Sequence, residues 1–423
     1  MLGLYIACIF VGNKVSRESG LSLFPVLYVS TSSLRQCYNG RRKSPDEAQR
    51  SRRRLLRGRR SRTALGHGEL VTVSSHRVKT DRSSETQAKQ RIMLAETSRL
   101  RAILVVLLTT PHLVSASGQR PVYNIYHMVN AIWQVDEGME LDANAIESDV
   151  AFDSDGTASW FYHGVPCDCF RWCNRYEKVP ALLRYLRRTT DGGIYEKRLT
   201  LLFLDLKTSS LYPDKKYVAG VDIARNLLNH LWLGVPVTKA LNVLLAVPSV
   251  DDAEVFRGAV HTIHRQRPDM IDKIGFDITN NEDLNTIEKM YRQLGIRGHR
   301  WQGDGITNCL SFLRPARRRN SVVANRDEGE PYGFVEKAYQ WTIDIPHQLR
   351  LSLRNNVDGI ITNRPDRLAY ILKEKEFRSR MRLANVSDSP WTRFGCHRNC
   401  ESKPFISMDV LSDDGIDGAA IRA

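Results

Sequence analysis

Acidic and histidine side chains recur along several short apolar runs of this chain. The acidic pair Glu147 and Asp149 stands in AIESDVAF, and Asp205 stands in LLFLDLKT. Residues two apart on a strand point to the same side, so Glu147 and Asp149 can offer two carboxylates to one point in space. His127 and His163 lie in two further runs. Oxygen ligands at this density suit a hard cation such as Mg²⁺, and two nearby histidines suit proton transfer.

Eight apolar, strand-like runs alternating with amphipathic stretches must position these side chains. The runs predict strands at residues 122–127, 144–152, 199–207, 241–249, 272–279, 297–303, 338–344 and 357–363. Helices are predicted at 129–141, 180–188, 217–232, 255–266, 281–294 and 365–375. This alternation predicts a (β/α)₈ TIM barrel. A doubly wound open sheet is the alternative, although it usually has fewer strands.

Polar side chains cluster at the carboxyl ends of these predicted strands, whereas most other residues of the runs form the barrel wall. The carboxyl ends form the active-site face of a TIM barrel, and recurrence on several strands favours a site over isolated structural polar groups. The polar residues are His127, Glu147 and Asp149, Asp205 and Lys207, Gln302, Trp341 and Asp344, and Asn363.

The formal net charge of +15 is concentrated near the N-terminus of the chain. Residues 1–92 hold 19 Lys and Arg against 6 Asp and Glu, whereas the other 331 residues hold 43 against 41. The arginine-rich run at 49–62 could bind RNA or direct nuclear import, but a disordered basic extension, or translated sequence absent from the mature protein, is favoured. We therefore expect no nucleic-acid partner for the folded body.

Residues 93–116 have the layout of a secretory signal peptide. Arg99 and Arg101 precede an apolar run at 102–108, and the small residues Val114, Ser115 and Ala116 follow. The run is much shorter than the ~20 residues that span a bilayer, so a retained signal-anchor is the less favoured alternative. We expect a secreted, extracellular protein that begins near residue 117, with residues 1–92 as a possible artefact of the gene prediction.

Eight cysteines fit that prediction, because cleavage after Ala116 leaves six, an even number. Cys167, Cys169 and Cys173 could instead suggest zinc, but their spacing matches no structural zinc pattern, and a secreted context favours disulfides. The expected organisation is then an extension at 1–92, the signal peptide at 93–116, the barrel at 117–394 and a short tail at 395–423.

Several blocks of the body resemble the arachnid sphingomyelinase D enzymes, also called dermonecrotic toxins or venom phospholipases D. The blocks are HMVNAI (127–132), DANAIESDV (142–150), YHGVPCDC (162–169), FLDLKTSSLY (203–212), WQGDGITNC (301–309), YQWTID (339–344) and DGIITNRPD (358–366). The resemblance runs from about residue 120 to 394 and includes SDSPWTRF (387–394), which looks like the family's barrel-plugging tail. These enzymes are related to glycerophosphodiester phosphodiesterases.

The resemblance implies a lyase-type phospholipase D reaction on choline phospholipids at membrane surfaces, with one Mg²⁺ and no stable protein partner. Choline would leave sphingomyelin or lysophosphatidylcholine as the lipid's own hydroxyl attacks, which gives a cyclic phosphate. The implied roles are metal ligation by Glu147, Asp149 and Asp205, proton transfer by His127 and His163, phosphate binding by Lys207, and head-group contact by Tyr339 and Trp341. Asp168 is expected to orient His163 or to anchor its loop, and Asp344 and Asn363 to support the catalytic groups from behind.

The same resemblance implies disulfides Cys167–Cys173 and Cys169–Cys309, which leaves Cys396 and Cys400 as a pair. The chain also departs from the family's pattern. Tyr126 stands where the family typically has glycine, and Gly303 stands where many members have serine, which puts one polar contact to the substrate in doubt.

Two other functions remain open on the residues alone. One is a glycerophosphodiester phosphodiesterase acting on small soluble diesters. The other is a catalytically silent, membrane-binding, toxin-like protein, which would require the loss of a catalytic group. No catalytic residue of the family pattern is missing from the sequence, so an active enzyme is the favoured prediction.

Overall fold

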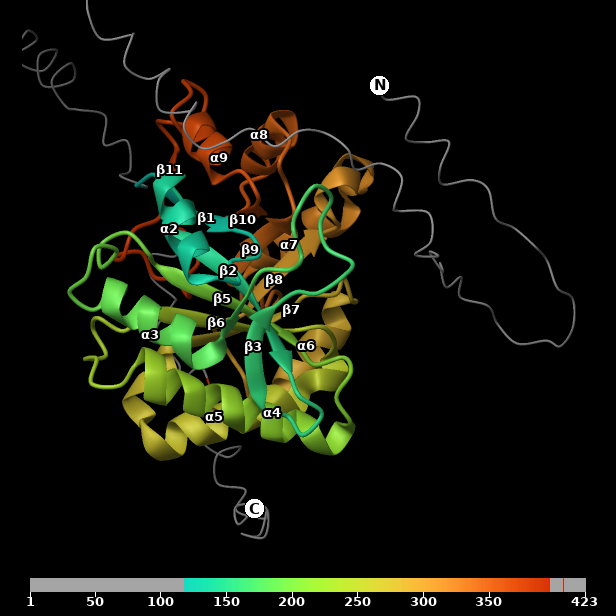
Figure 1. The fold of residues 1–423 in the computed structure, drawn as a ribbon. Helices are drawn as coiled ribbons and strands as arrows, with labels where there is room; N and C mark the ends of the chain where they lie inside the picture. The colour runs from blue at the N-terminus through green and yellow to red at the C-terminus, as the bar shows by residue number, and fades with distance from the viewer. Residues whose placement is uncertain (1–117, 396–405, 407–423) are drawn as a thin grey trace, which may run out of the picture. The chain divides into compact units, whose positions relative to one another are not determined.

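Residues 118–395 and 406 are described by a computed structural model of the chain, in which eight parallel strands form the centre (Figure 1). They run in the order β7-β6-β5-β2-β1-β10-β9-β8, and a bridge between Phe276 of β7 and Arg300, just before β8, closes the ring. The predicted TIM barrel is confirmed, because an open sheet would leave β7 and β8 unpaired. The strands are β1 Arg120–Tyr126, β2 Ala145–Phe152, β5 Leu201–Lys207, β6 Asn242–Val247, β7 Ile274–Ile278, β8 Trp301–Gly305, β9 Lys337–Trp341 and β10 Gly359–Thr362.

Strand β5 shows how the apolar runs build the barrel and aim its polar ends. Leu202, Leu204 and Leu206 pack in the cluster between the strands and the helices, whereas Leu201 and Phe203 pack in the barrel interior. Because side chains alternate along a strand, Asp205 and Lys207 follow Leu201 and Phe203 on the inward face. A strand buried on both faces is therefore apolar throughout until its carboxyl end reaches the mouth.

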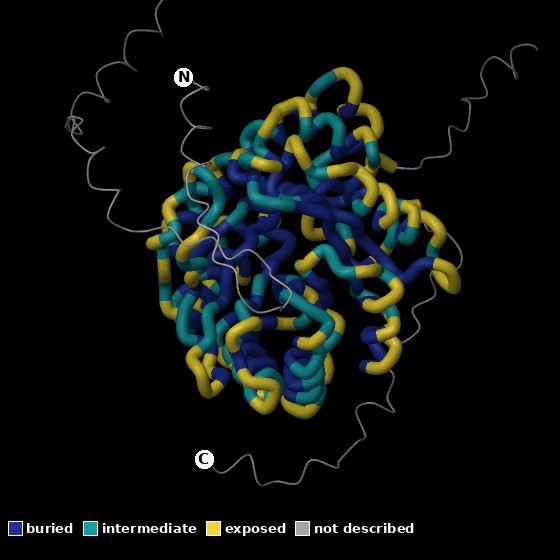
Figure 2. The backbone as a smooth tube through the Cα atoms, turned by 90° about the vertical axis from the view of Figure 1, so that its right-hand side faces the viewer, coloured by how far each residue is buried: buried dark blue, intermediate teal, exposed yellow. Residues whose placement is uncertain are grey.

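Helices surround the strands (Figure 1), and in Figure 2 the buried backbone, in dark blue, gathers at the centre of the molecule. Helices overlap all six predicted ranges: α2 Ile132–Glu140, α3 Val179–Thr190, α4 Pro213–Asn226, α5 Ala253–Gln266, α6 Leu284–Gln293 and α9 Pro365–Leu372. Two helices were not predicted, α7 Arg317–Glu328 and α8 Pro346–Arg354. The sequence of α7, RRRNSVVANRDE, is almost entirely polar and buries few apolar side chains, so it lacks the periodicity that a helix prediction needs.

A short antiparallel excursion follows β2 and was not predicted. Strand β3, Ala158–Tyr162, pairs with β2 and with β4, Tyr176–Lys178. Between β3 and β4 lies the loop that carries His163 and three cysteines. The two strands thus hold both ends of this loop over the carboxyl end of β2.

The amino end of the barrel is closed by the segment after α9. Strand β11, Met381–Leu383, pairs with β1, and Trp391 packs within the barrel interior while its ring stacks on His299 at 4.9 Å between centroids. Gly275 makes room for this ring, because a Cβ there would lie 2.2 Å from Trp391. The segment SDSPWTRF therefore plugs the barrel, as the resemblance implied. Farther along, Ile406 is buried and forms a bridge to Ile296.

Within the described residues, no helix combines the length and the apolarity needed to cross a membrane. The predicted extension at 1–92, the predicted signal peptide at 93–116, and Cys396 with Cys400 lie outside the described residues.

Candidate active site

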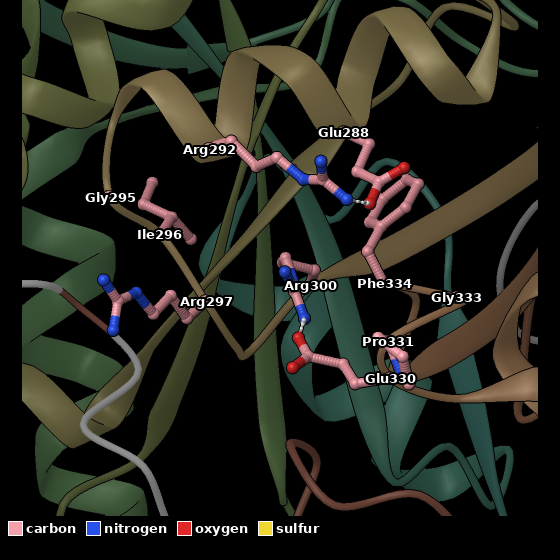
Figure 3. Close-up of a pocket in the computed structure, with 10 residues that line it drawn as sticks. All are labelled: Glu288, Arg292, Gly295, Ile296, Arg297, Arg300, Glu330, Pro331, Gly333 and Phe334. Atoms are coloured by element: carbon pink, nitrogen blue, oxygen red, sulfur yellow. Dashed lines mark hydrogen bonds and ion pairs between the residues drawn. The ribbon is translucent and has the colours of Figure 1, made fainter.

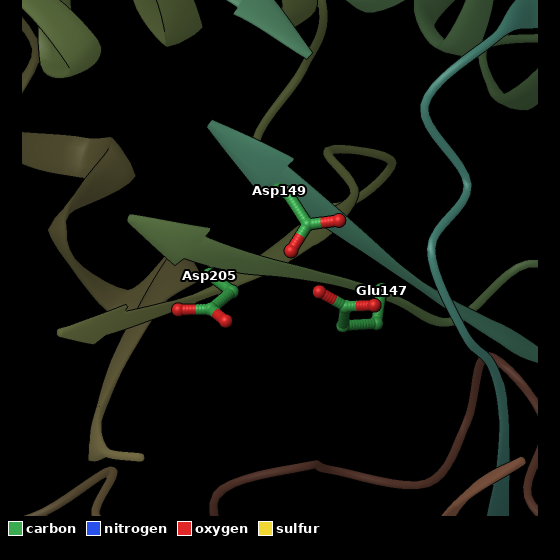
Figure 4. A group of neighbouring side chains, drawn as sticks. All are labelled: Glu147, Asp149 and Asp205. Atoms are coloured by element: carbon green, nitrogen blue, oxygen red, sulfur yellow. The ribbon is translucent and has the colours of Figure 1, made fainter. Parts of the chain in front are cut away.

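Three carboxylates from two neighbouring strands converge at the carboxyl end of the barrel. Glu147 and Asp149 belong to β2 and Asp205 to β5, where Asp149 and Asp205 are direct register partners. One ligand oxygen from each lies within 4.8 Å of the others (Figure 4). The strand spacing that predicted this cluster is therefore realised in the fold.

Like charges at this separation disturb the protonation of the cluster. Burial, and then the charge of Asp149, raise the pKa of Glu147 to about 8. For Asp149, burial alone would raise the pKa, but the charges of Lys207 and His163 outweigh it and lower the pKa. Oδ1 of Asp205 is buried and has no hydrogen-bond partner among the described residues. A cluster of three carboxylates with an unsatisfied buried oxygen fits a hard divalent cation.

Lys207 supplies the positive charge nearest to the cluster. Its Nζ lies 2.8 Å from Oδ1 of Asp149 and 2.6 Å from Oδ2 of Asp205. Burial alone would lower the pKa of Lys207, but the charges of Asp205 and Asp149 raise it well above its ordinary value. The side chain remains about a third exposed, so its ammonium borders both the carboxylates and the open mouth.

His127 follows β1 and contacts Glu147 on one side of the cluster. Its Nε2 lies 3.9 Å from Oε2 of Glu147, and its Nδ1 lies 3.3 Å from Oδ2 of Asp168 and 3.0 Å from Oδ1 of Asn363. Burial alone would lower the pKa of His127, but the hydrogen bond with Asp168 and the charge of Glu147 raise it to about 9. Both neighbours of Nδ1 are oxygen acceptors, so this nitrogen carries a proton.

His163 contacts the cluster from the side of Asp149. Its Nε2 lies 4.0 Å from Oδ1 of Asp149, and its Nδ1 lies 3.0 Å from the carbonyl oxygen of Gly164. A carbonyl only accepts hydrogen bonds, so Nδ1 of His163 donates, and in the neutral form of the ring this leaves the lone pair at Nε2. The two predicted histidines thus stand beside different carboxylates of one cluster.

The role expected for Asp168 needs one correction. Asp168 does not orient His163; its carboxylate contacts His127, accepts from Oγ1 of Thr307 at 2.7 Å and accepts from Nδ2 of Asn363 at 3.3 Å. Burial alone would raise its pKa, but these hydrogen bonds and the charge of His127 lower it. Asp168 therefore anchors its own loop, as the second alternative held, and faces the other histidine.

Asn363 and Asp344 continue this hydrogen-bond network away from the mouth. Asp344 accepts from the backbone N–H of Asn363 at 2.7 Å and from its Nδ2 at 2.9 Å. Nδ2 of Asn308 also donates to Asp344, and it donates to the carbonyl of Cys169 as well. Asn308 was not predicted, and its place beside Cys309 was the one signal that could have found it.

Two disulfides fix the loop that carries His163. Cys167 pairs with Cys173 and Cys169 pairs with Cys309, which confirms both implied pairings. Within the smaller ring, Arg171 donates to the backbone carbonyl of His127 at 2.7 Å. Arg171 was also not predicted, because no sequence pattern distinguishes an arginine that hydrogen-bonds a neighbouring loop from one that is exposed to solvent.

Tyr339 and Trp341 occupy different depths of the barrel. Both lie on the inward face of β9, but Tyr339 is only 2% exposed and its hydroxyl donates to Oδ2 of Asp277 at 2.7 Å. Burial raises the pKa of Asp277 to about 8. Gly303 makes room for the Tyr339 ring, because a Cβ at Gly303 would lie 2.5 Å from it. Trp341 is partly buried nearer the mouth, and contact of either ring with a head group stays a prediction.

A cavity of about 480 Å³ lies away from these residues (Figure 3). It is bordered by the segments that lead into β8 and β9, at the amino end of the barrel, and contains none of the predicted site residues. Two ion pairs lie within its lining, Arg292 with Glu288 at 2.5 Å and Arg300 with Glu330 at 2.8 Å. The carboxyl end remains the candidate active site.

Sequence comparisons with known proteins point to one family. A sequence model described as dermonecrotic toxin SPH matches residues 117–391, which include every predicted site residue. Dermonecrotic toxin SPH of Ixodes scapularis is 44% identical over 301 residues, covering 70% of this chain and 83% of that protein. Dermonecrotic toxin LsaSicTox-alphaIB2i of Loxosceles sabina is 41% identical over 272 residues, covering 63% and 98%.

A crystal structure of a glycerophosphodiester phosphodiesterase from Parabacteroides distasonis is also similar, at 14% identity and a TM-score of 0.39, covering 59% of this chain and 98% of that one. At that level the likeness says nothing about function.

Proposed function

We propose that this chain, which belongs to the dermonecrotic toxin SPH family, is a secreted phospholipase D that removes choline from sphingomyelin and lysophosphatidylcholine. Membership supports a phosphodiester-cleaving enzyme of the sphingomyelinase D type. The observation that carries the proposal is the convergence of two histidines and three carboxylates at one end of the barrel. Their shared location supports phosphodiester cleavage more strongly than any one of these residues does alone.

Glu147, Asp149 and Asp205 would hold one Mg²⁺. When bound, such an ion would supply positive charge to offset that of the phosphate oxygens. Lys207 lies against two of the three carboxylates and can contact a phosphate oxygen as a point charge. Lys207 therefore offers the anionic phosphate a positive contact beside three carboxylates whose own negative charge would repel it.

The hydrogen bonds of the two histidines support different roles. His163 donates through Nδ1 to a carbonyl, so the lone pair at its Nε2 can accept the proton of the attacking hydroxyl. His127 has acceptors at Nδ1 and a raised pKa, so it keeps a second proton at Nε2 that it can donate to the departing choline oxygen. The lipid hydroxyl oxygen bonds to phosphorus as the phosphorus–choline bond breaks, which leaves a cyclic phosphate.

The choline head group requires a site for a quaternary ammonium. Trp341 is partly buried near the mouth, where cation–π attraction contributes about 0.5–2 kcal/mol. Tyr339 lies deeper and would contribute by positioning, since its hydroxyl is engaged by Asp277. Secretion is proposed with the same enzyme, because the two disulfides suit an oxidising compartment.

The proposal is tested by choline release from sphingomyelin and lysophosphatidylcholine, with phosphorus NMR of the product. We expect a cyclic phosphate from the wild type, and a loss of about 100- to 10,000-fold in rate for His127→Asn and for His163→Asn. Glycerophosphocholine is the matched soluble substrate. Preferential cleavage of that diester would favour the glycerophosphodiester phosphodiesterase alternative, and no choline release from any substrate would favour the silent membrane-binding protein.

A further inference from the structure

Large apolar side chains are exposed on the loop between β3 and β4. Val165, Phe170 and Trp172 are 86%, 91% and 66% exposed. Phe170 also has a φ of 65°, a left-handed conformation that is uncommon for a bulky residue. The Cys167–Cys173 ring encloses Phe170 and Trp172. The disulfide-closed loop therefore leaves both rings exposed to solvent, although the burial of apolar surface is favourable.

A second exposed apolar segment lies next to the first. Leu310, Phe312 and Leu313 are exposed in the 3₁₀ turn Asn308–Leu313 that follows β8. The Cys169–Cys309 disulfide joins the two segments covalently, and Nδ2 of Asn308 donates to the carbonyl of Cys169 at 3.0 Å. We call the six side chains Val165, Phe170, Trp172, Leu310, Phe312 and Leu313 the rim patch.

Isolated exposed apolar residues are ordinary on protein surfaces, and this chain has some, such as Ile194 and Tyr332 at the amino end of the barrel. The rim patch differs because six such residues lie on two cross-linked loops beside the candidate active site. A gathered apolar surface of this kind marks a contact with a partner or a membrane.

The charge beside the rim patch favours one partner. Residues 306–320 contain four arginines, of which Arg314 pairs with Asp304 at 2.8 Å, Arg318 donates to the carbonyl of Gly303 and Arg319 is buried. On the other loop, Asp168 is turned inward to His127, whereas Arg175 lies at the outer side over the Trp133 ring. Arg317 is exposed at the start of α7. Basic residues flanking exposed aromatic and aliphatic side chains are complementary to a bilayer that contains anionic lipid.

We propose that the rim patch inserts into the surface of a bilayer and that the flanking arginines favour bilayers with anionic phospholipid. The proposal rests on the proposed function in one respect, because such docking would bring the barrel mouth to a lipid substrate. The cross-link makes the two loops one rigid platform, so both halves enter the bilayer together.

The test measures co-sedimentation with vesicles of phosphatidylcholine, with or without phosphatidylglycerol, in EDTA and without sphingomyelin, so that no turnover occurs. The double variants Phe170→Ala/Trp172→Ala and Phe312→Ala/Leu313→Ala should each weaken binding at least about tenfold, because each removes two side chains that the bilayer would bury. Tyr332→Ala, which removes an equally exposed ring from the amino end, should bind as the wild type does. Arg175→Gln/Arg317→Gln should weaken only the binding to vesicles with phosphatidylglycerol.

Wild-type binding by both apolar double variants would overturn the proposal, as would equal weakening by Tyr332→Ala. Light scattering gives a further check. A dimer that is lost in the same variants would make the rim patch a subunit interface and would also overturn it. His127→Asn should bind vesicles normally, and Phe312→Ala/Leu313→Ala should retain its rate on a soluble short-chain substrate. Failure of the docking surface and failure of the proposed function are thereby distinguishable.

Discussion

The two ends of the barrel differ in how far their buried carboxylates are compensated by positive side chains. At the amino end, Asp358 is buried, yet one carboxylate oxygen meets Arg120 at 2.7 Å and the other meets Arg326 at 2.5 Å and the backbone N–H of Ala338 at 2.9 Å. At the carboxyl end, the ammonium of Lys207 contacts two of three converging carboxylates, and the third, Glu147, lies 3.9 Å from Nε2 of His127.

The pKa shifts express the same contrast. Burial alone would raise the pKa of Asp358, but the charges of Arg326, Lys337 and Arg120 lower it. For Glu147, burial and the neighbouring carboxylate act together and raise the pKa. Charge at the amino end is compensated within the fold and supports stability. Charge at the carboxyl end is left for a ligand, which is the usual relation between an active site and its scaffold.

Removing one carboxylate from the carboxyl end should produce the largest change. For Glu147→Gln we expect choline release to fall by at least about a thousandfold, since the charge stabilisation from a bound metal is worth several kcal/mol. Above about pH 8 the melting temperature in EDTA should rise relative to the wild type, because the ionised Glu147 that repels Asp149 at that pH has been removed. Calorimetry beside the activity assay checks both effects, and a lower melting temperature would contradict the comparison.

The matching change at the amino end should have the opposite pattern. Asp358→Asn removes the buried partner of Arg326 and leaves it the exposed Asp327, and breaking a buried ion pair in this way costs about 3–5 kcal/mol in the free energy of unfolding. The turnover rate should stay within about twofold, because Asp358 lies far along the barrel from the candidate site. Denaturant unfolding measures the first effect; a variant as stable as wild type would show that the pair contributes little.

An intermediate effect is expected in how the free energy of unfolding depends on pH, which should be dominated by the groups at the carboxyl end. In EDTA, a folded-state pKa of Glu147 near 8 against 4.5 when unfolded means that the folded protein binds more protons between these values. Stability should therefore fall as the pH rises through this window, and the raised pKa of His127 acts in the same direction above pH 6.5. Added Mg²⁺ should reduce this slope, and Glu147→Gln should flatten it. A stability that rises across the window in EDTA would count against the site.

The smallest effect is expected for an ion pair that is not buried. Arg354 and Glu376 lie 2.7 Å apart, but both side chains are more than a third exposed. Glu376→Gln should change the free energy of unfolding by less than about 1 kcal/mol and leave activity unchanged. A loss comparable with that of Asp358→Asn would mean that burial does not explain the contrast between the two ends.

The sequence predicted correctly those side chains whose direction depends only on their position along one strand. The interior of β5 and the pair in β2 follow from alternation, which needs no knowledge of distant segments. Hydrogen-bond partners that are far apart in the sequence were harder to predict, because they depend on how the loops pack. Asp168 contacts His127 rather than His163, and Asn308 donates to Asp344. Helix α7 was missed because its polar sequence is held by the barrel rather than by its own periodicity.

The central claim is that the carboxylates of β2 and β5 hold a divalent cation that the reaction requires. The most direct test measures choline release from sphingomyelin by the wild-type protein in EDTA, followed by titration with Mg²⁺. We predict that activity is lost in EDTA and restored as Mg²⁺ saturates one site. Full activity in EDTA would contradict the claim.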